Sequence, residues 1–89
     1  MEISLAGRAA IVTGGSKGIG FAVAKRFATS GADVAIVGRD EEALKEAVAA
    51  IKKSANTRVI GVQADVSKAA DIQRAYDDVM KAFDKVDII

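Results

Sequence analysis

Apolar side chains in this sequence form short continuous runs, which alternate with longer stretches where they recur every three or four residues. The run at 9–13 (AAIVT) has the unbroken apolar character of a strand that is buried on both faces. Similar β-branched runs occupy 33–37 and 58–63, and residues 86–89 (VDII) open another. We therefore predict three complete strands and the start of a fourth.

The stretch between the first two runs has helical spacing. Ile19, Val23 and Phe27 recur every four residues, which places one apolar stripe along a helix. Gly31 follows this stretch and suits the left-handed backbone conformation in which many helices end. A first helix is therefore predicted to follow the first strand directly.

A second helix is predicted after the run at 33–37. Asp40 is a favourable N-cap, and Glu41 adds negative charge to the first turn, where the helix dipole favours it. Lys45 lies one turn later and can pair with Glu41. The predicted apolar face of this helix consists of Leu44, Val48 and Ile51.

Ser67 is predicted to cap a third helix. The predicted buried face of that helix consists of Ile72, Tyr76, Val79 and Phe83. Strands and helices that alternate on this scale indicate right-handed crossovers and a parallel sheet. No linker or low-complexity tract interrupts the pattern, so we expect a single folding unit that is cut short.

Composition excludes several kinds of chemistry. The 89 residues contain no Cys and no His, so thiolate nucleophiles, disulfides and histidine bases are absent. Thirteen basic and twelve acidic residues give a net charge of +1, which does not favour nucleic acid or an anionic membrane as a partner. The sequence has neither the pattern of a signal peptide nor an apolar run of about 20 residues, so a cytoplasmic location is expected.

Four glycines stand between the first strand and the first helix. Gly14, Gly15, Gly18 and Gly20 fall where the chain must turn, and glycine allows positive φ and the close approach of a ligand. The next helix offers free N–H groups and a positive dipole end, which together suit a phosphate group. The spacing differs from G-x-G-x-x-G, and Phe21 stands where a nucleotide-triphosphate loop has its lysine. The alternative is a tight strand-to-helix turn with no ligand.

Residues 13–20 (TGGSKGIG) resemble the T-G-x-x-x-G-x-G motif of the short-chain dehydrogenase/reductase family, classical type. The resemblance continues at 5–8 (LAGR), before the first strand, and at 64–67 (ADVS), after the third. Residues 86–89 are similar to the start of the strand that ends in N-N-A-G in the family. The resemblance implies a Rossmann-type α/β fold with strand order 3-2-1-4, of which residues 1–89 form the N-terminal part. The third helix is then expected on the opposite face from the first two.

The end of the second strand predicts which dinucleotide binds. An acidic residue there would bind a free ribose 2′-hydroxyl, whereas an arginine accommodates a 2′-phosphate. By resemblance, Gly38 stands where family members that prefer NAD carry the acid, Arg39 follows it, and Lys17 can reach the same ribose edge. These cations favour NADP, with NAD less favoured. Two alternatives remain: both cations are solvated surface charges, or Asp40 turns back to a ribose hydroxyl.

Asp65 has two interpretations. In the first, it is a plain loop residue that caps or solvates the turn before the third helix. In the second, which the resemblance implies, it contacts the adenine amino group, and the backbone of Val66 lies beside the ring. The complete set of predicted cofactor-binding residues is Gly14, Ser16, Lys17, Gly18, Ile19, Gly20, Arg39, Asp65 and Val66.

The reductive chemistry of the family uses a tyrosine with a lysine four residues later, because an ammonium lowers the pKa of the phenol. The single tyrosine, Tyr76, has Met80 at that position and Lys81 one residue further on. Tyr76 is therefore predicted to be a core residue, and no catalytic or metal-binding residue is assigned.

The resemblance implies the NADP-binding portion of an oxidoreductase that interconverts a carbonyl and an alcohol, with residues 1–89 alone inactive. The alternatives are a non-enzymatic or truncated dinucleotide-binding module and an α/β interaction domain without a nucleotide. Bare strand edges and exposed apolar surface predict poor stability and self-association unless further polypeptide completes the fold. A homo-oligomer is expected once it is complete.

Overall fold

The chain folds into alternating strands and helices. The computed structural model describes residues 4–14 and 18–88. In chain order, its elements are β1 (Ala9–Thr13), α1 (Gly18–Thr29), β2 (Asp33–Gly38), α2 (Glu41–Lys52), β3 (Val59–Gln63) and α3 (Ala69–Phe83). The predicted strands are confirmed, with β2 one residue longer and β3 one residue shorter than expected.

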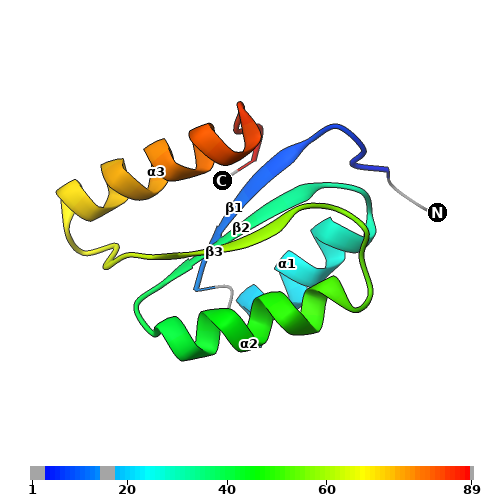
Figure 1. Cartoon of the computed structure of the whole chain (residues 1–89), viewed down its shortest axis with the longest axis horizontal. Helices are drawn as coiled ribbons and strands as arrows, with labels where there is room; N and C mark the ends of the chain where they lie inside the picture. Colours follow the sequence, from blue (N-terminus) through cyan, green and yellow to red (C-terminus); the bar gives the residue numbers. More distant parts are fainter. Residues whose placement is uncertain (1–3, 15–17, 89) are drawn as a thin grey trace.

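The three strands form a parallel sheet with β2 between β1 and β3 (Figure 1). Helices α1 and α2 cover one face, and α3 covers the other (Figure 1). On the free side of β1, Ile88 forms a parallel bridge with Ala10, and the Ile11 amide donates to the Ile88 carbonyl at 2.8 Å. The Rossmann-type α/β fold and the strand order 3-2-1-4 are therefore confirmed as far as Ile88.

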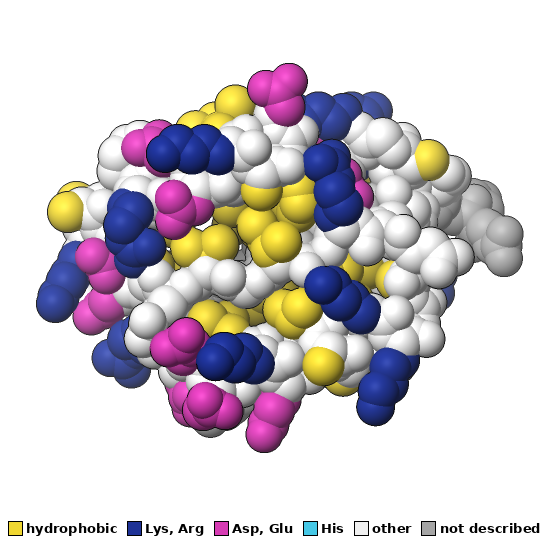
Figure 2. Space-filling view, in the orientation of Figure 1, with side chains coloured by type: hydrophobic (Ala, Val, Ile, Leu, Met, Phe, Trp, Pro, Cys, Tyr) yellow, Lys and Arg dark blue, Asp and Glu magenta, His cyan; other side chains and the backbone are white. Residues whose placement is uncertain are grey.

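The surface seen in Figure 2 carries charges of both signs. Lys and Arg are interspersed with Asp and Glu over this face, and hydrophobic side chains show in hollows beside the middle of the molecule (Figure 2). One hollow, about 340 Å³, has Leu44, Val48 and Gly61 among its lining residues, so it lies between α2 and the outer edge of β3. In the described part of the chain, no helix is long and apolar enough to cross a membrane.

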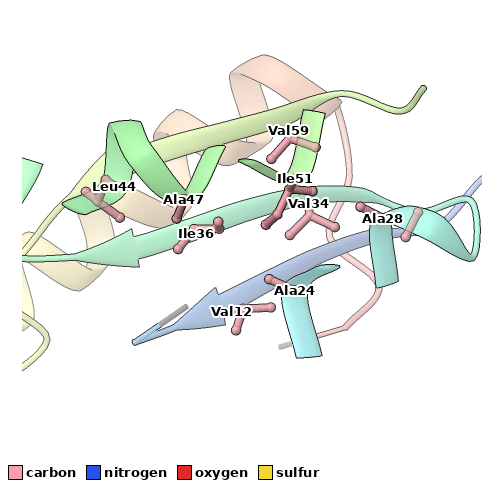
Figure 3. Packing of buried hydrophobic residues seen from close by; sticks show 10 residues of the cluster. Val12, Ala24, Ala28, Val34, Ile36, Leu44, Ala47, Ile51 and Val59 are labelled. Carbon is pink, nitrogen blue, oxygen red and sulfur yellow. The ribbon is translucent and has the colours of Figure 1, made fainter. Parts of the chain in front are cut away.

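The core on the α1–α2 face is built from alternate residues of the strands. Val12, Val34, Ile36 and Val59 point towards the two helices, as the two-residue period of a strand requires. Figure 3 shows Ala24 and Ala28 of α1 and Leu44, Ala47 and Ile51 of α2 packed against these strand residues. The strand residues between them form the second core, on the α3 side, with Ala75, Val79 and Phe83.

The predicted apolar stripe of α1 is wrong for two of its three residues. Ile19 is 85% exposed and Val23 is 38% exposed, and only Phe27 is partly buried. The helix instead packs through Ala24 and Ala28, whose small side chains let it approach the sheet closely. The stripe is therefore rotated by one residue, or about 100°, from the predicted one.

The predicted buried face of α3 is half right. Val79 and Phe83 are buried, but Ile72 is 50% exposed and Tyr76 is 40% exposed, so the prediction that Tyr76 is a core residue is wrong. Ala75, which lies between Ile72 and Tyr76 in the sequence, is buried instead of these two residues. As in α1, an alanine is buried where the predicted larger side chains are exposed.

The predicted caps differ in outcome. Asp40 caps α2, because its Oδ1 accepts a hydrogen bond from the Ala43 amide at 3.2 Å. The predicted cap of α3 is wrong: Lys68 occupies the N-cap position without a side-chain hydrogen bond. The Ser67 hydroxyl instead donates to Asp65 at 2.6 Å, which removes it from the helix terminus.

Candidate functional site

The carboxyl ends of the three strands meet at one edge of the sheet, as parallel pairing requires. A cleft of about 400 Å³ opens there, which we call the strand-end cleft. Its lining residues are Gly14, Gly38, Arg39, Ala64, Asp65, Val66 and Ser67. Each of the three strands therefore contributes the residues that follow it to a single cleft.

Gly14 begins the turn after β1. Its φ is +69°, and its amide donates to the Val37 carbonyl at 2.9 Å, which ties the turn to β2. Gly18, the first residue of α1, has a φ of +55°. Apart from chain neighbours and the backbone of its own helix, a Cβ built on either glycine would meet no atom of the described residues within 4 Å, so these residues leave the space in front of both backbones open. Both positions require glycine for backbone conformation, and both leave room for a ligand.

The first turn of α1 differs in charge from the first turns of the other two helices. It contains no acidic residue, whereas α2 has Glu41 and Glu42 there and α3 has Asp71. Amide groups at a helix N-terminus are free to donate, and the dipole end is positive. The start of α1 can therefore accept an anion that carboxylates would repel at α2 and α3.

Arg39 stands just beyond the end of β2. The Gln63 side-chain amide donates to the Arg39 carbonyl at 3.1 Å, so the next strand holds this part of the backbone in place. The Arg39 residue is exposed and lines the strand-end cleft. The arrangement fixes the backbone while leaving the guanidinium group able to meet a ligand.

Asp65 is held by hydrogen bonds on both sides. Its Oδ1 accepts from the Ser67 hydroxyl at 2.6 Å and the Ser67 amide at 2.9 Å, while its own amide donates to Asp71 Oδ2 at 2.9 Å. The hydroxyl and then the amide of Ser67 lower the pKa of Asp65 below its ordinary value, aided by the charge of Arg39. Asp65 is therefore an anionic hydrogen-bond acceptor at neutral pH, and Val66 beside it is 50% exposed.

The structure brings together four of the predicted cofactor-binding residues, since Gly14, Arg39, Asp65 and Val66 line one cleft. Three further predicted cofactor-binding residues, Gly18, Ile19 and Gly20, form the first turn of α1. Ser16 and Lys17 lie outside the described residues.

Sequence reasoning missed Gln63, which holds the Arg39 carbonyl, and Asp71, which holds the Asp65 amide. Each is an ordinary exposed or half-exposed polar residue. No local signal distinguishes either of them before the strands are aligned.

A sequence profile described as short chain dehydrogenase matches residues 8–89. This range includes both the glycine turn and the end of β3. The chain belongs to the short-chain dehydrogenase family. The resemblance seen in the glycine motif is thereby confirmed.

Curated proteins and solved structures of this family are similar to the chain over nearly its whole length. Peroxisomal 2,4-dienoyl-CoA reductase of Arabidopsis thaliana is 39% identical over 83 residues, which cover 93% of this chain and 28% of that protein. L-Sorbose reductase of Gluconobacter frateurii, solved with NADPH and L-sorbose, has a TM-score of 0.93 at 32% identity, covering 99% of this chain and 34% of that one. A short chain dehydrogenase of Burkholderia cenocepacia, solved with NADP, has a TM-score of 0.88 at 42% identity, covering 97% and 36%. The chain thus spans about a third of the length of these short-chain dehydrogenases.

Tyr76 does not line the strand-end cleft, although the hollow that it lines shares Val66 with that cleft. It lines an apolar hollow of about 160 Å³ under the start of α3, together with Ile72, Val66 and residues of β1 and β2. Among the described residues, no group of three or more Asp or Glu is placed to hold a metal ion.

Proposed function

We propose that this chain is the NADP-binding portion of an oxidoreductase that interconverts a carbonyl and an alcohol by hydride transfer. One observation carries the proposal: the three strand ends form a single cleft beside a helix terminus that has no carboxylate in its first turn. Relatives whose names describe reductases, and similar structures solved with NADPH or NADP, support it.

The residues present fit a dinucleotide. The open space in front of Gly14 and Gly18 accommodates a diphosphate that accepts hydrogen bonds from the amides of the first turn of α1. Asp65 accepts a hydrogen bond from the adenine amino group, with Val66 beside the ring. The nicotinamide ring supplies the hydride chemistry when the cofactor is bound. Ser16, Lys17, Ile19 and Gly20 complete the proposed binding set.

Arg39 and the absence of a carboxylate at Gly38 favour NADP over NAD. An anion at that position would repel a 2′-phosphate, whereas the exposed Arg39 attracts it. Asp40 does not compete for the ribose, because its carboxylate caps α2. The cofactor preference therefore follows from the end of β2.

No residue of this chain is assigned to proton transfer. Tyr76 lacks a lysine four residues later and lies outside the strand-end cleft, which favours the second candidate function, a dinucleotide-binding module without its own chemistry. Under either function residues 1–89 alone are inactive. Homo-oligomer formation when the fold is complete and a cytoplasmic location both stay predictions.

The test compares the NADP affinities of the wild-type chain and the Gly18→Val variant, each measured by titration. A valine at a φ of +55° displaces the start of α1 and places methyl groups in the open space, so binding is lost while far-UV circular dichroism stays largely unchanged. Gly7→Val is the matched control. Gly7 also has a positive φ, +81°, with open space around it, but it precedes β1 at the opposite end of that strand. Undiminished NADP binding by Gly18→Val, or equal loss in the control, contradicts the proposal.

A further inference from the structure

A second cleft adjoins the strand-end cleft and shares Arg39, Ala64 and Asp65 with it. We call it the outer cleft, and its volume is about 330 Å³. Its lining residues are Arg39, Gln63, Ala64, Asp65, Asp71 and Arg74. The two clefts therefore adjoin at the ends of β2 and β3, and Arg74 lines the outer cleft alone.

Arg74 is held by two contacts with its own part of the fold. One terminal nitrogen donates to the Gln63 carbonyl at 2.6 Å, and the other lies 3.5 Å from an Asp78 carboxylate oxygen one turn further along α3. Two anchors at different nitrogens fix the plane of a guanidinium group, which has five N–H donors in total. Arg74 thus presents an oriented, planar donor to the outer cleft, although its side chain is about half exposed.

The charges around the outer cleft are balanced, because Arg39 and Arg74 are matched by Asp65 and Asp71. A phosphate would meet two carboxylates there, so a purely anionic ligand does not suit this lining. A planar heterocycle with both donors and acceptors does suit it. A guanidinium group stacks on such a ring or donates to a ring nitrogen, and a carboxylate accepts from an exocyclic amino group.

From this geometry we infer that Arg74 is a recognition residue for the adenine base, which spans the boundary between the two clefts. Asp65 lies at that boundary, within reach of both clefts, and Arg74 bounds the base on its outer side. Arg39 lies at the same boundary and meets the 2′-phosphate from the strand-end cleft. The inference rests on the proposed dinucleotide function and adds to it a residue on α3.

The experiment compares the affinities of the wild-type chain, Arg74→Ala and Arg74→Lys for NADP, NAD and 5′-AMP by calorimetric titration. Loss of an oriented charged donor weakens binding of all three ligands by a similar factor of about ten, because all three contain adenine. Arg74→Lys keeps the charge but not the plane or the fork, so it shows a similar loss. The ratio of the NADP and NAD affinities stays at its wild-type value in both variants. Arg26→Ala, an exposed arginine on α1 that lines neither cleft, is the matched control and leaves all three affinities unchanged.

Three results overturn the inference: a loss confined to NADP, which assigns Arg74 to the 2′-phosphate; full rescue by Arg74→Lys, which reduces its role to charge; and unchanged affinities. Far-UV circular dichroism of each variant excludes unfolding as the cause of a loss, and Arg74→Lys tests the inference even where Arg74→Ala unfolds. Absence of NADP binding by the wild-type chain overturns the proposed function, and this inference with it. Wild-type binding with unaffected Arg74 variants overturns this inference alone.

Discussion

The guanidinium group of Arg58 binds the carboxylate of Asp33 with two of its nitrogens, Nη2 at 2.7 Å and Nε at 3.0 Å from Oδ2. The Arg58 amide also donates to the other carboxylate oxygen at 2.9 Å. A third side-chain nitrogen donates to the Ala82 carbonyl at 2.9 Å, and the guanidinium carbon lies 5.1 Å from the centre of the Phe83 ring. One side chain thus joins the starts of β2 and β3 to the end of α3, at the opposite end of the sheet from the strand-end cleft.

The first prediction is that Arg58 and Asp33 are coupled by about 1 kcal/mol in a double-mutant cycle of Arg58→Ala and Asp33→Ala. The two-point contact and the partly buried carboxylate raise this pair above an ordinary surface pair, although the half-exposed Arg58 keeps the value modest. Free energies of unfolding from urea titrations provide the measurement. Glu41 and Lys45, a more exposed pair at 3.8 Å, serve as the control with an expected coupling of about 0.4 kcal/mol. Equal coupling energies in the two pairs would show that the contact through two Arg58 nitrogens adds no stability beyond that of an ordinary surface ion pair.

The same contact predicts a pH dependence of stability. Partial burial raises the pKa of Asp33, but the hydrogen bonds and charge of Arg58 outweigh burial and bring the pKa below its ordinary value. A carboxyl whose pKa is lower in the folded state stabilises the fold at neutral pH and loses that contribution as the pH falls through its folded pKa. The stability advantage of wild type over Asp33→Asn is therefore constant above about pH 5 and shrinks below about pH 4. Urea unfolding of both proteins from pH 7 to pH 3 checks this, and a pH-independent difference would contradict it.

The strand order followed from the family resemblance, but the strands themselves could be predicted from the sequence pattern, above all β2, which is buried on both faces. Every residue from Val34 to Val37 is buried, so this strand appears in the sequence as an unbroken apolar run. The predicted face of α2 is confirmed, with Leu44 and Ile51 buried and Val48 partly buried, but the orientations of α1 and of the start of α3 could not be predicted in the same way. In α1 and at the start of α3, alanines pack against the sheet while larger side chains such as Ile19 and Tyr76 stay exposed, and apolar periodicity alone does not distinguish the two arrangements.

The candidate site likewise contains some residues that could be predicted from the sequence and others that could not. Gly14 and Arg39 could be predicted because each follows directly from the end of a strand. Gln63 could not, because its role depends on β3 lying beside β2 so that its amide reaches the Arg39 carbonyl. Arg74 depends likewise on how α3 returns over the end of β3. Local patterns thus predict the residues at strand ends, but contacts between neighbouring elements require the fold.

A third prediction concerns cofactor choice. Replacing Arg39 by Asp is expected to remove the proposed charge-assisted hydrogen bond to the 2′-phosphate and to add repulsion, so the ratio of NADP to NAD affinity falls by roughly thirtyfold, or about 2 kcal/mol. Dissociation constants for both dinucleotides, measured at one salt concentration, give this ratio. Arg26→Asp makes the same charge change on α1, away from the cleft, and leaves the ratio unchanged because salt screens distant charges. An unaltered ratio in Arg39→Asp would refute the assignment of NADP.

The last prediction is that exposed apolar side chains on α3 cause the 89-residue chain to self-associate. Ile72 and Tyr76 are each exposed by 40% or more, and with Val66 they border a hollow whose lining is almost entirely apolar. Such a patch is covered by association in water, so Ile72→Lys and Tyr76→Lys lower the average mass measured by sedimentation equilibrium at a given concentration. Gln73→Lys adds the same charge at an exposed polar position of the same helix and leaves the mass near that of wild type. If all three variants lower the mass equally, net charge and not the apolar patch governs association. A wild-type chain that stays monomeric at high concentration would contradict the prediction outright.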